Sequence, residues 1–221
     1  MAHYRWAEGW LACYWVLTSV LLIFGPKASQ ATVELGLLQA VAAVLLFVFT
    51  SWCQRHSGLT WMSWLVWIPA ILWTYKNIDI VQKALNRPSF ESQVQAWEKA
   101  IWKFSPALEW SQSWPWLVFS EALHFCYCTY YLILPVLLVR LLRRERDDLA
   151  RICLAGGISA LVCSYFGSIW FPVQGPRPLY PPLAAELQGP LWTFCHWLSR
   201  EGAAAAAAFP SGHVSLSSCV A

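Results

Sequence analysis

The chain has 221 residues, of which 58% are hydrophobic and only 12% are charged, with a formal net charge of +3. Soluble domains carry about 25% charged residues, so this composition excludes an ordinary soluble domain and indicates a membrane protein with several spans. The small positive charge gives no indication of a nucleic-acid partner. The 16 Trp fit a membrane protein, because Trp gathers at the membrane interface. The eight Cys are scattered, mostly inside apolar runs, and we interpret them as small buried residues rather than a disulfide framework or a zinc site.

Apolar runs close to membrane-spanning length recur along the chain. They predict transmembrane helices at about residues 10–24, 34–52, 59–75, 114–142 and 152–171. The first run is short enough for a signal peptide, but further spans follow without a clean cleavage pattern, so we interpret it as a retained helix. The predicted fold is an all-α polytopic transmembrane bundle that forms a single membrane domain over residues 1–221.

Residues 76–113 are polar and are interrupted by two prolines. Within them apolar side chains recur every three or four positions, at Val94, Trp97, Ile101 and Phe104. This spacing predicts an amphipathic helix over about 89–105, lying in the membrane interface and N-capped by Ser89. A helix packed on the extramembrane loops is the alternative.

The fourth apolar run carries polar residues on one helical face. Glu121 and His124 are three apart, and Cys128 and Tyr131 continue the stripe. A carboxylate at bilayer depth costs about 2.5–3.5 kcal/mol on insertion scales, so Glu121 is expected to face a cavity or a partner. Both a role lining a functional site and a Glu–His hydrogen bond that joins helices remain open. A single Glu-x-x-His does not indicate a metal site, because di-iron bundles need this motif twice.

Arginines are concentrated between the fourth and fifth apolar runs. Arg140, Arg143, Arg144, Arg146 and Arg151 give the strongest positive-inside signal in the chain. They predict that this solvated loop and the N-terminus are cytoplasmic in a cell (inner) membrane. The segment that comes after the fifth run then emerges on the outer face, although the lysines of the amphipathic stretch on that side weigh against the assignment.

The residues between 172 and 213 form a long predicted loop with two chemically distinctive turns. In the first, Gly175-Pro176-Arg177-Pro178, two prolines restrict the backbone around a guanidinium that can bind two phosphate oxygens at once. The second turn, Pro210-Ser211-Gly212-His213, precedes an apolar run and is predicted to open a helix, where free N–H groups favour an anion. Gly212 leaves room for that anion, and His213 can donate a proton to a leaving oxygen.

These two motifs, in this order in a membrane protein, resemble the type 2 phosphatidic acid phosphatase superfamily, which includes the vanadium haloperoxidases. The resemblance covers about the second half of the chain and is nearest to the inositolphosphotransferase-like membrane branch. It implies hydrolysis or transfer of a phosphoryl group on a phospholipid or polyprenyl phosphate, without a metal or another cofactor. It assigns phosphate binding to Arg177, Ser211 and Gly212, and the general-acid role to His213.

The chain departs from this family pattern at two points. Trp170 stands where the first motif often has Lys, and the third motif, S-R-x-x-x-x-x-H-x-x-x-D, which supplies the nucleophilic His, is absent. We therefore expect a chain truncated after Ala221, in a sixth span that begins near residue 210. A non-enzymatic membrane fragment or binding protein is the alternative function. A transporter that relays protons through Glu121 and His124 is a third possibility.

Overall fold

The computed structural model describes residues 5–56, 60–175, 184–202, 204 and 206–220, and all structural statements refer to these residues. Their fold is all-α, as predicted, and the only β-type pairing among them is one isolated bridge. The helices are α1 (Arg5–Phe24), α2 (Gln30–Arg55), α3 (Thr60–Ala84), α4 (Glu91–Trp102), α5 (Pro106–Ser113), α6 (Leu117–Leu142), α7 (Asp147–Trp170), the 3-10 helix η3 (Ala185–Leu187), α8 (Pro190–Gly202) and α9 (Gly212–Val220).

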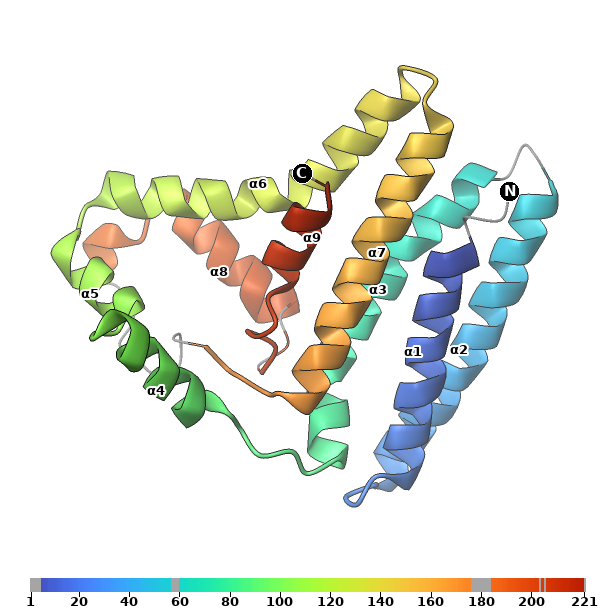
Figure 1. Cartoon of the computed structure of the whole chain (residues 1–221), viewed down its shortest axis with the longest axis horizontal. Coiled ribbons are helices and arrows are strands. Elements are labelled where there is room, and N and C mark those ends of the chain that lie inside the picture. The colour runs from blue at the N-terminus through green and yellow to red at the C-terminus, as the bar shows by residue number, and fades with distance from the viewer. Residues whose placement is uncertain (1–4, 57–59, 176–183, 203, 205, 221) are drawn as a thin grey trace.

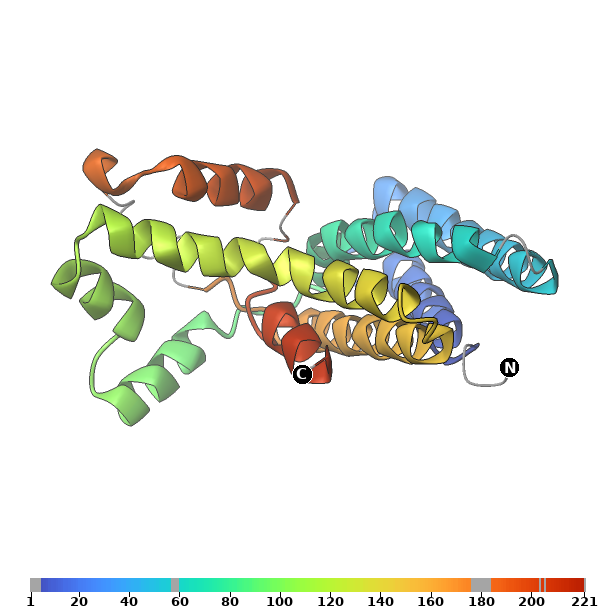
Figure 2. The same cartoon turned by 90° about the horizontal axis from the view of Figure 1, so that it is seen from above.

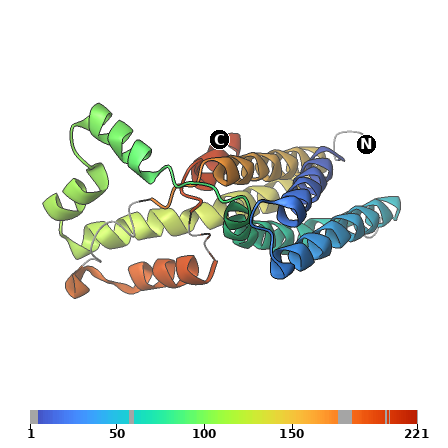
Figure 3. The ribbon, with the colours of Figure 1, turned by 90° about the horizontal axis from the view of Figure 1, so that it is seen from below.

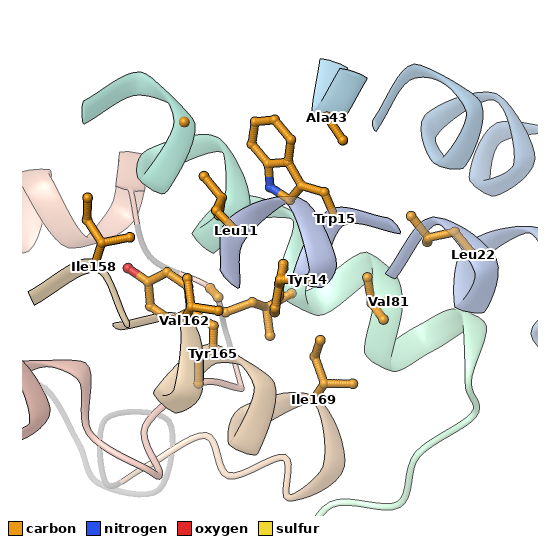
Figure 4. Close-up of a cluster of buried hydrophobic side chains, with 14 of the residues drawn as sticks. Leu11, Tyr14, Trp15, Leu22, Ala43, Val81, Ile158, Val162, Tyr165 and Ile169 are labelled. Atoms are coloured by element: carbon orange, nitrogen blue, oxygen red, sulfur yellow. The ribbon is translucent and has the colours of Figure 1, made fainter. Parts of the chain in front are cut away.

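Four long helices, α1, α2, α3 and α7, lie side by side as a bundle (Figure 1). Its core is a cluster of buried apolar side chains, to which α1 contributes Leu11, Tyr14 and Trp15 (Figure 4). Val162, Tyr165 and Ile169 of α7, with Val81 of α3, complete the part of the cluster that faces α1. The bundle is therefore organised around α1 and α7, although these helices are far apart in sequence.

Buried polar side chains also join the bundle helices. The Trp15 indole N–H of α1 donates to the Thr74 hydroxyl of α3 at 2.7 Å. The Gln39 amide of α2 donates to the Thr18 hydroxyl of α1, also at 2.7 Å. Hydrogen bonds of this kind hold helices together where the surroundings supply no water.

Three of the described helices are long and apolar enough to cross a membrane, namely Gln30–Cys53, Leu117–Leu142 and Asp147–Trp170. The apolar part of α1, Gly9–Phe24, is shorter. The outward face of α2 exposes large apolar side chains along its whole length: Leu37, Leu38, Val41, Val44, Leu45 and Val48. No residue of α6 is buried. These faces need an apolar environment, so the chain is a membrane protein.

A second group of helices lies beside the bundle. The first part of α6 runs away from the bundle, with α8 along one side and α4 and α5 along the other (Figures 1–3). The second part of α6 turns and runs along α7 (Figure 1). Pro135 lies inside α6 and lacks a backbone donor, which is an ordinary cause of such a bend. The short helix α9 packs between α6 and α7.

The boundaries differ from the sequence-based prediction in three places. The third helix was predicted to end at Tyr75 but continues to Ala84, because Ile78 and Val81 of the extension are buried in the bundle core. The predicted amphipathic helix is present as α4, but Phe90 rather than Ser89 is its N-cap residue. The residues predicted as one loop between 172 and 213 contain η3 and α8, and this prediction was wrong. The helix α8 has 13 residues and is amphipathic, as α4 is.

The arrangement of the bundle ends bears on the predicted topology. The end of α2 and the arginine-rich link between α6 and α7 lie at one end of the bundle, and the chain leaves α7 at the opposite end (Figure 1). The arginine-rich link and the segment after Trp170 are therefore separated along the bundle axis. Which membrane face each end meets stays a prediction.

Candidate functional site

The described beginning of the first motif lies beside the residues that lead into the second. Val173 and Ala207 form the isolated parallel bridge, and the Ala208 N–H donates to the Val173 carbonyl at 2.9 Å. A Cβ atom at Gly175 would lie only 3.0 Å from the Cβ of Ala208. The segments around Val173 and Ala207 therefore lie side by side, although the helix α8 lies between them in the sequence. Arg177 lies outside the described residues, so its predicted meeting with His213 stays a prediction.

The second motif is fixed to one face of α7. The Ser164 hydroxyl donates to the Pro210 carbonyl at 2.7 Å, and the Ser168 hydroxyl donates to the Phe209 carbonyl at 3.3 Å. Between these serines, a Cβ at Gly167 would approach the Pro210 ring to 2.8 Å. Gly167 therefore permits a close contact between α7 and the second motif.

The end of α3 holds the same segment from the other side. The Gln82 side-chain amide donates to the Ser168 carbonyl at 2.8 Å and to the Ala206 carbonyl at 2.9 Å. An Asp79 carboxylate oxygen accepts from the Ala206 N–H at 3.3 Å. Polar side chains of two bundle helices therefore fix the lead-in to His213.

The helix α9 begins at Gly212, so the predicted helix start at the second motif is confirmed. Ser211 caps it, since its hydroxyl accepts from the Val214 N–H at 3.4 Å. A Cβ at Gly212 would point toward α7 and meet Leu161 at 3.4 Å, an ordinary contact. On the side of Gly212 that faces α7, side chains of that helix occupy the space, so this side does not support the expectation that Gly212 leaves room for an anion.

His213 lies among three tyrosines of α6. Its imidazole centroid is 4.1 Å from the ring of Tyr130, 4.6 Å from Tyr127 and 6.0 Å from Tyr131. The Tyr130 hydroxyl donates to the Gly212 carbonyl at 3.4 Å, which ties the tyrosine to the helix start. The His213 Nε2 atom is buried and has no hydrogen-bond partner. Such an orphaned polar atom is costly, so the site is short of one polar contact here.

A groove of about 570 Å³ opens next to this imidazole. Hydroxyl-bearing side chains of α6, of the second motif and of α9 line part of it: Tyr127, Tyr130, Ser211, Ser217 and Ser218. The remaining lining is mainly apolar, with Ile133 and Val214 among it. The groove thus combines polar donors with an apolar wall, a lining suited to a ligand that has a polar head and an apolar part.

Glu121 connects α6 to α8, and its hydrogen bonds go to the backbone of α8 and not to His124. Its two carboxylate oxygens accept from the backbone N–H groups of Leu191 and Trp192, each at 2.9 Å. A carboxylate at this place stabilises the positive end of α8. His124 Nδ1 lies 2.7 Å from the carbonyl oxygen of Ser120 in its own helix. The polar stripe of α6 could line a functional site or join helices, and these contacts favour the second interpretation. The connection is made by Glu121 and the backbone of α8, and not by a hydrogen bond between Glu121 and His124.

Cysteines make a further contact between α6 and α8. The Sγ atoms of the free thiols Cys128 and Cys195 lie 2.6 Å apart. Burial, and after it the contact with Cys128, raises the pKa of the Cys195 thiol to about 12, so the thiol stays protonated at neutral pH. Our interpretation of the cysteines as buried was wrong for others, since Cys13, Cys126, Cys163 and Cys219 are exposed.

Several contributors to this region were missed in the sequence, among them Gln82 and Asp79 of α3. Ser164 and Ser168 lie four apart within an apolar run, and a polar pair on one face of a membrane helix was the signal that could have revealed them. Glu91 at the start of α4 was missed as well. Its oxygen Oε2 accepts from the backbone N–H groups of Gln174 and Gly175.

The Trp170 ring, at the position where the first motif of the resembled family often has Lys, lies beside a cation from another segment. The Arg87 guanidinium lies 5.0 Å from the centroid of the Trp170 ring, and its Nη2 donates to the Trp170 carbonyl at 3.0 Å. The bundle therefore carries a positive charge at this point, although the sequence position itself is aromatic.

Fold and site together define an all-α membrane protein with a histidine at the head of a short helix, beside a partly polar groove. Comparison of the chain with protein-family models, with curated proteins and with solved structures found no match in any of the three. The resemblance to the phosphatase superfamily therefore rests on the two sequence motifs.

Proposed function

We propose that this protein is an integral membrane lipid-phosphate phosphatase or phosphotransferase that acts without a metal. The observation that carries the proposal is the pairing of Val173 with Ala207. Because of this pairing, the segments that precede the two motifs lie side by side. The His213 residue that lines a groove with a polar and an apolar part is a second support. A phospholipid or polyprenyl phosphate has the two chemical parts that such a groove can hold.

The residues of the chain supply two parts of the chemistry. Arg177, Ser211 and Gly212 bind the phosphate, through a guanidinium fork and the free N–H groups at the start of α9. His213 donates its proton to the leaving oxygen as the bond from phosphorus to that oxygen breaks. In the family that the motifs resemble, a histidine of a third motif attacks phosphorus. The two motifs of this chain do not supply that step.

We place the site at the outer boundary between membrane and water. The chain leaves α7 at the end of the bundle opposite the arginine-rich link, and arginine-rich loops are usually cytoplasmic (Figure 1). A lipid phosphate head group lies at that depth. The orientation and the cell (inner) membrane belong to the proposal.

The test measures ligand binding and turnover separately. Protein expressed from its complete gene is purified in detergent and titrated with water-soluble dihexanoyl phosphatidic acid. Phosphate release is measured from phosphatidic acid and from a polyprenyl phosphate, with and without inositol as acceptor. Arg177→Ala should lower turnover by about 10²–10³-fold, as the loss of a preorganised charge does. Arg200→Ala on α8 is the matched control. Equal binding and turnover in both variants would defeat the proposal, and binding without turnover would favour the non-enzymatic alternative.

A further inference from the structure

The first side chain of α4 binds the backbone at which the first motif begins. Oxygen Oε2 of Glu91 accepts from the Gln174 N–H at 2.8 Å and from the Gly175 N–H at 3.0 Å. Gly175 has a φ of 82°, a conformation that glycine adopts easily. Two successive N–H groups aimed at one point form a concave site for an anion, and here the anion is a carboxylate of the chain itself.

The neighbouring residues strengthen this attachment. The Phe90 N–H donates to the Pro172 carbonyl at 2.9 Å, and the Phe90 ring stacks on Phe171 at 4.3 Å between centroids. Trp97, two turns further along α4, also stacks on Phe171 at 6.0 Å. The segment 171–175 is therefore held by α4 at several points, and Glu91 makes the only side-chain hydrogen bonds to its backbone amides among the described residues.

The attachment lies immediately before the arginine of the first motif. Arg177 comes two residues after Gly175, so the backbone that Glu91 fixes is the backbone from which the first motif departs. Hydrogen bonds to a carboxylate are stronger than those to a neutral acceptor, so Glu91 restrains this point more than an amide could. A chain that is restrained just before a binding residue loses less freedom when that residue binds its ligand.

We propose that Glu91 is a positioning residue for the phosphate-binding motif, which it holds through the amides of Gln174 and Gly175. The proposal rests on the proposed function, since it names what prepares the phosphate-binding side of that site. It also predicts the direction in which Glu91 changes the affinity for phosphate. A carboxylate that merely competed with the phosphate for a cation would lower this affinity, whereas a positioning carboxylate raises it.

The first test reads the contact itself. Hydrogen–deuterium exchange at the amides of Gln174 and Gly175 should be slow in the wild type, faster in Glu91→Gln and fastest in Glu91→Ala. Glu98→Gln removes the same charge two turns further along the same helix and should leave these amides unchanged. Equal exchange in the wild type and in both Glu91 variants would overturn the proposal.

The second test reads the consequence for the ligand. Dihexanoyl phosphatidic acid is titrated up to millimolar concentration into the wild type, Glu91→Gln, Arg177→Ala and the double variant. Glu91→Gln should weaken binding about 10-fold in the wild-type background, the size expected when a charged hydrogen-bond partner is lost. The same change should have less than about a twofold effect once Arg177 is gone, because a positioning residue acts through the group that it positions.

The outcomes separate this proposal from the proposed function. Binding that depends on Arg177 and not on Glu91, that strengthens in Glu91→Gln, or that weakens equally in both backgrounds overturns the positioning role alone. Absence of binding in the wild type overturns the proposed function and the positioning role with it, even where the exchange experiment shows the contact.

Discussion

The two motif segments are held by different parts of the molecule. The second motif is bonded to Ser164 and Ser168 of α7, and Gln82 of α3 bonds its lead-in, so it belongs to the bundle core. The segment before the first motif is held by α4, a helix with no buried residue that lies beside the bundle. The proposed proton donor, His213, is therefore fixed on the bundle. The proposed phosphate-binding motif depends on a part whose local stability is expected to be lower.

This difference predicts how each segment responds to change. Substitutions around the second motif should affect the stability of the bundle as well as the site. Substitutions on α4 should affect the site while the bundle stays folded.

The largest expected effect is that of His213→Ala. Without a general acid, phosphate release should fall by about 10²–10⁴-fold, with little change in the binding of dihexanoyl phosphatidic acid. His196→Ala on α8 is the matched control, because the His196 imidazole stacks on Trp192 and does not line the groove. Turnover that survives His213→Ala, or falls equally in His196→Ala, would contradict the assigned role.

The next effect is that of Gly167→Val, which tests the attachment of the second motif to α7. The new side chain would enter the space of the Pro210 ring and should lower the free energy of unfolding by about 1–3 kcal/mol. Thermal denaturation in detergent measures this loss. Gly9→Val provides the comparison, because nothing lies within 4 Å of a Cβ at Gly9. Equal melting temperatures for the two variants would show that the contact with Pro210 is not formed.

A smaller effect is expected from Glu121→Ala, which tests the peripheral helices. Loss of the carboxylate at the start of α8 should cost about 1–2 kcal/mol locally, because two backbone donors lose their acceptor. Hydrogen exchange at Leu191 and Trp192 should accelerate, while that of α7 stays slow. Glu109→Ala on α5 is the control. A proton flux in proteoliposomes that disappears in Glu121→Gln would instead revive the transporter interpretation.

The smallest effect is that of Tyr130→Phe. The substitution removes a long hydrogen bond to the Gly212 carbonyl and keeps the ring in contact with the His213 imidazole, so turnover should change less than about twofold. Tyr130→Ala also removes the ring and should lower turnover by about tenfold. If the phenylalanine variant were as impaired as the alanine variant, the hydroxyl rather than the ring contact would be the important part.

The sequence predicted those features that depend on local composition. The all-α class, the amphipathic helix α4 and the helix start at Gly212 derive from apolar runs, from three-to-four spacing and from a Pro-Ser-Gly sequence. The helix α8 was missed although it is amphipathic like α4. Its first N–H groups are bound by Glu121 of α6, a contact that local composition does not indicate.

The support of the site was less accessible to prediction. Glu91 and Gln174 are 83 positions apart, and Gln82 and Ala206 are 124 apart. Nothing in local composition indicates that such residues meet, because the meeting depends on how α3, α4 and α7 are packed. The residues that carry the proposed chemistry were visible in the sequence, and the residues that hold them were not.

The most direct measurement is an experimental structure of the protein with orthovanadate, a phosphate analogue, bound in detergent or nanodiscs. The proposed function predicts that the vanadate lies at the start of α9, with the Arg177 guanidinium and the His213 imidazole each within about 3 Å of its oxygens. An Arg177 side chain on the opposite membrane face from His213, or a vanadate bound away from both, would contradict it.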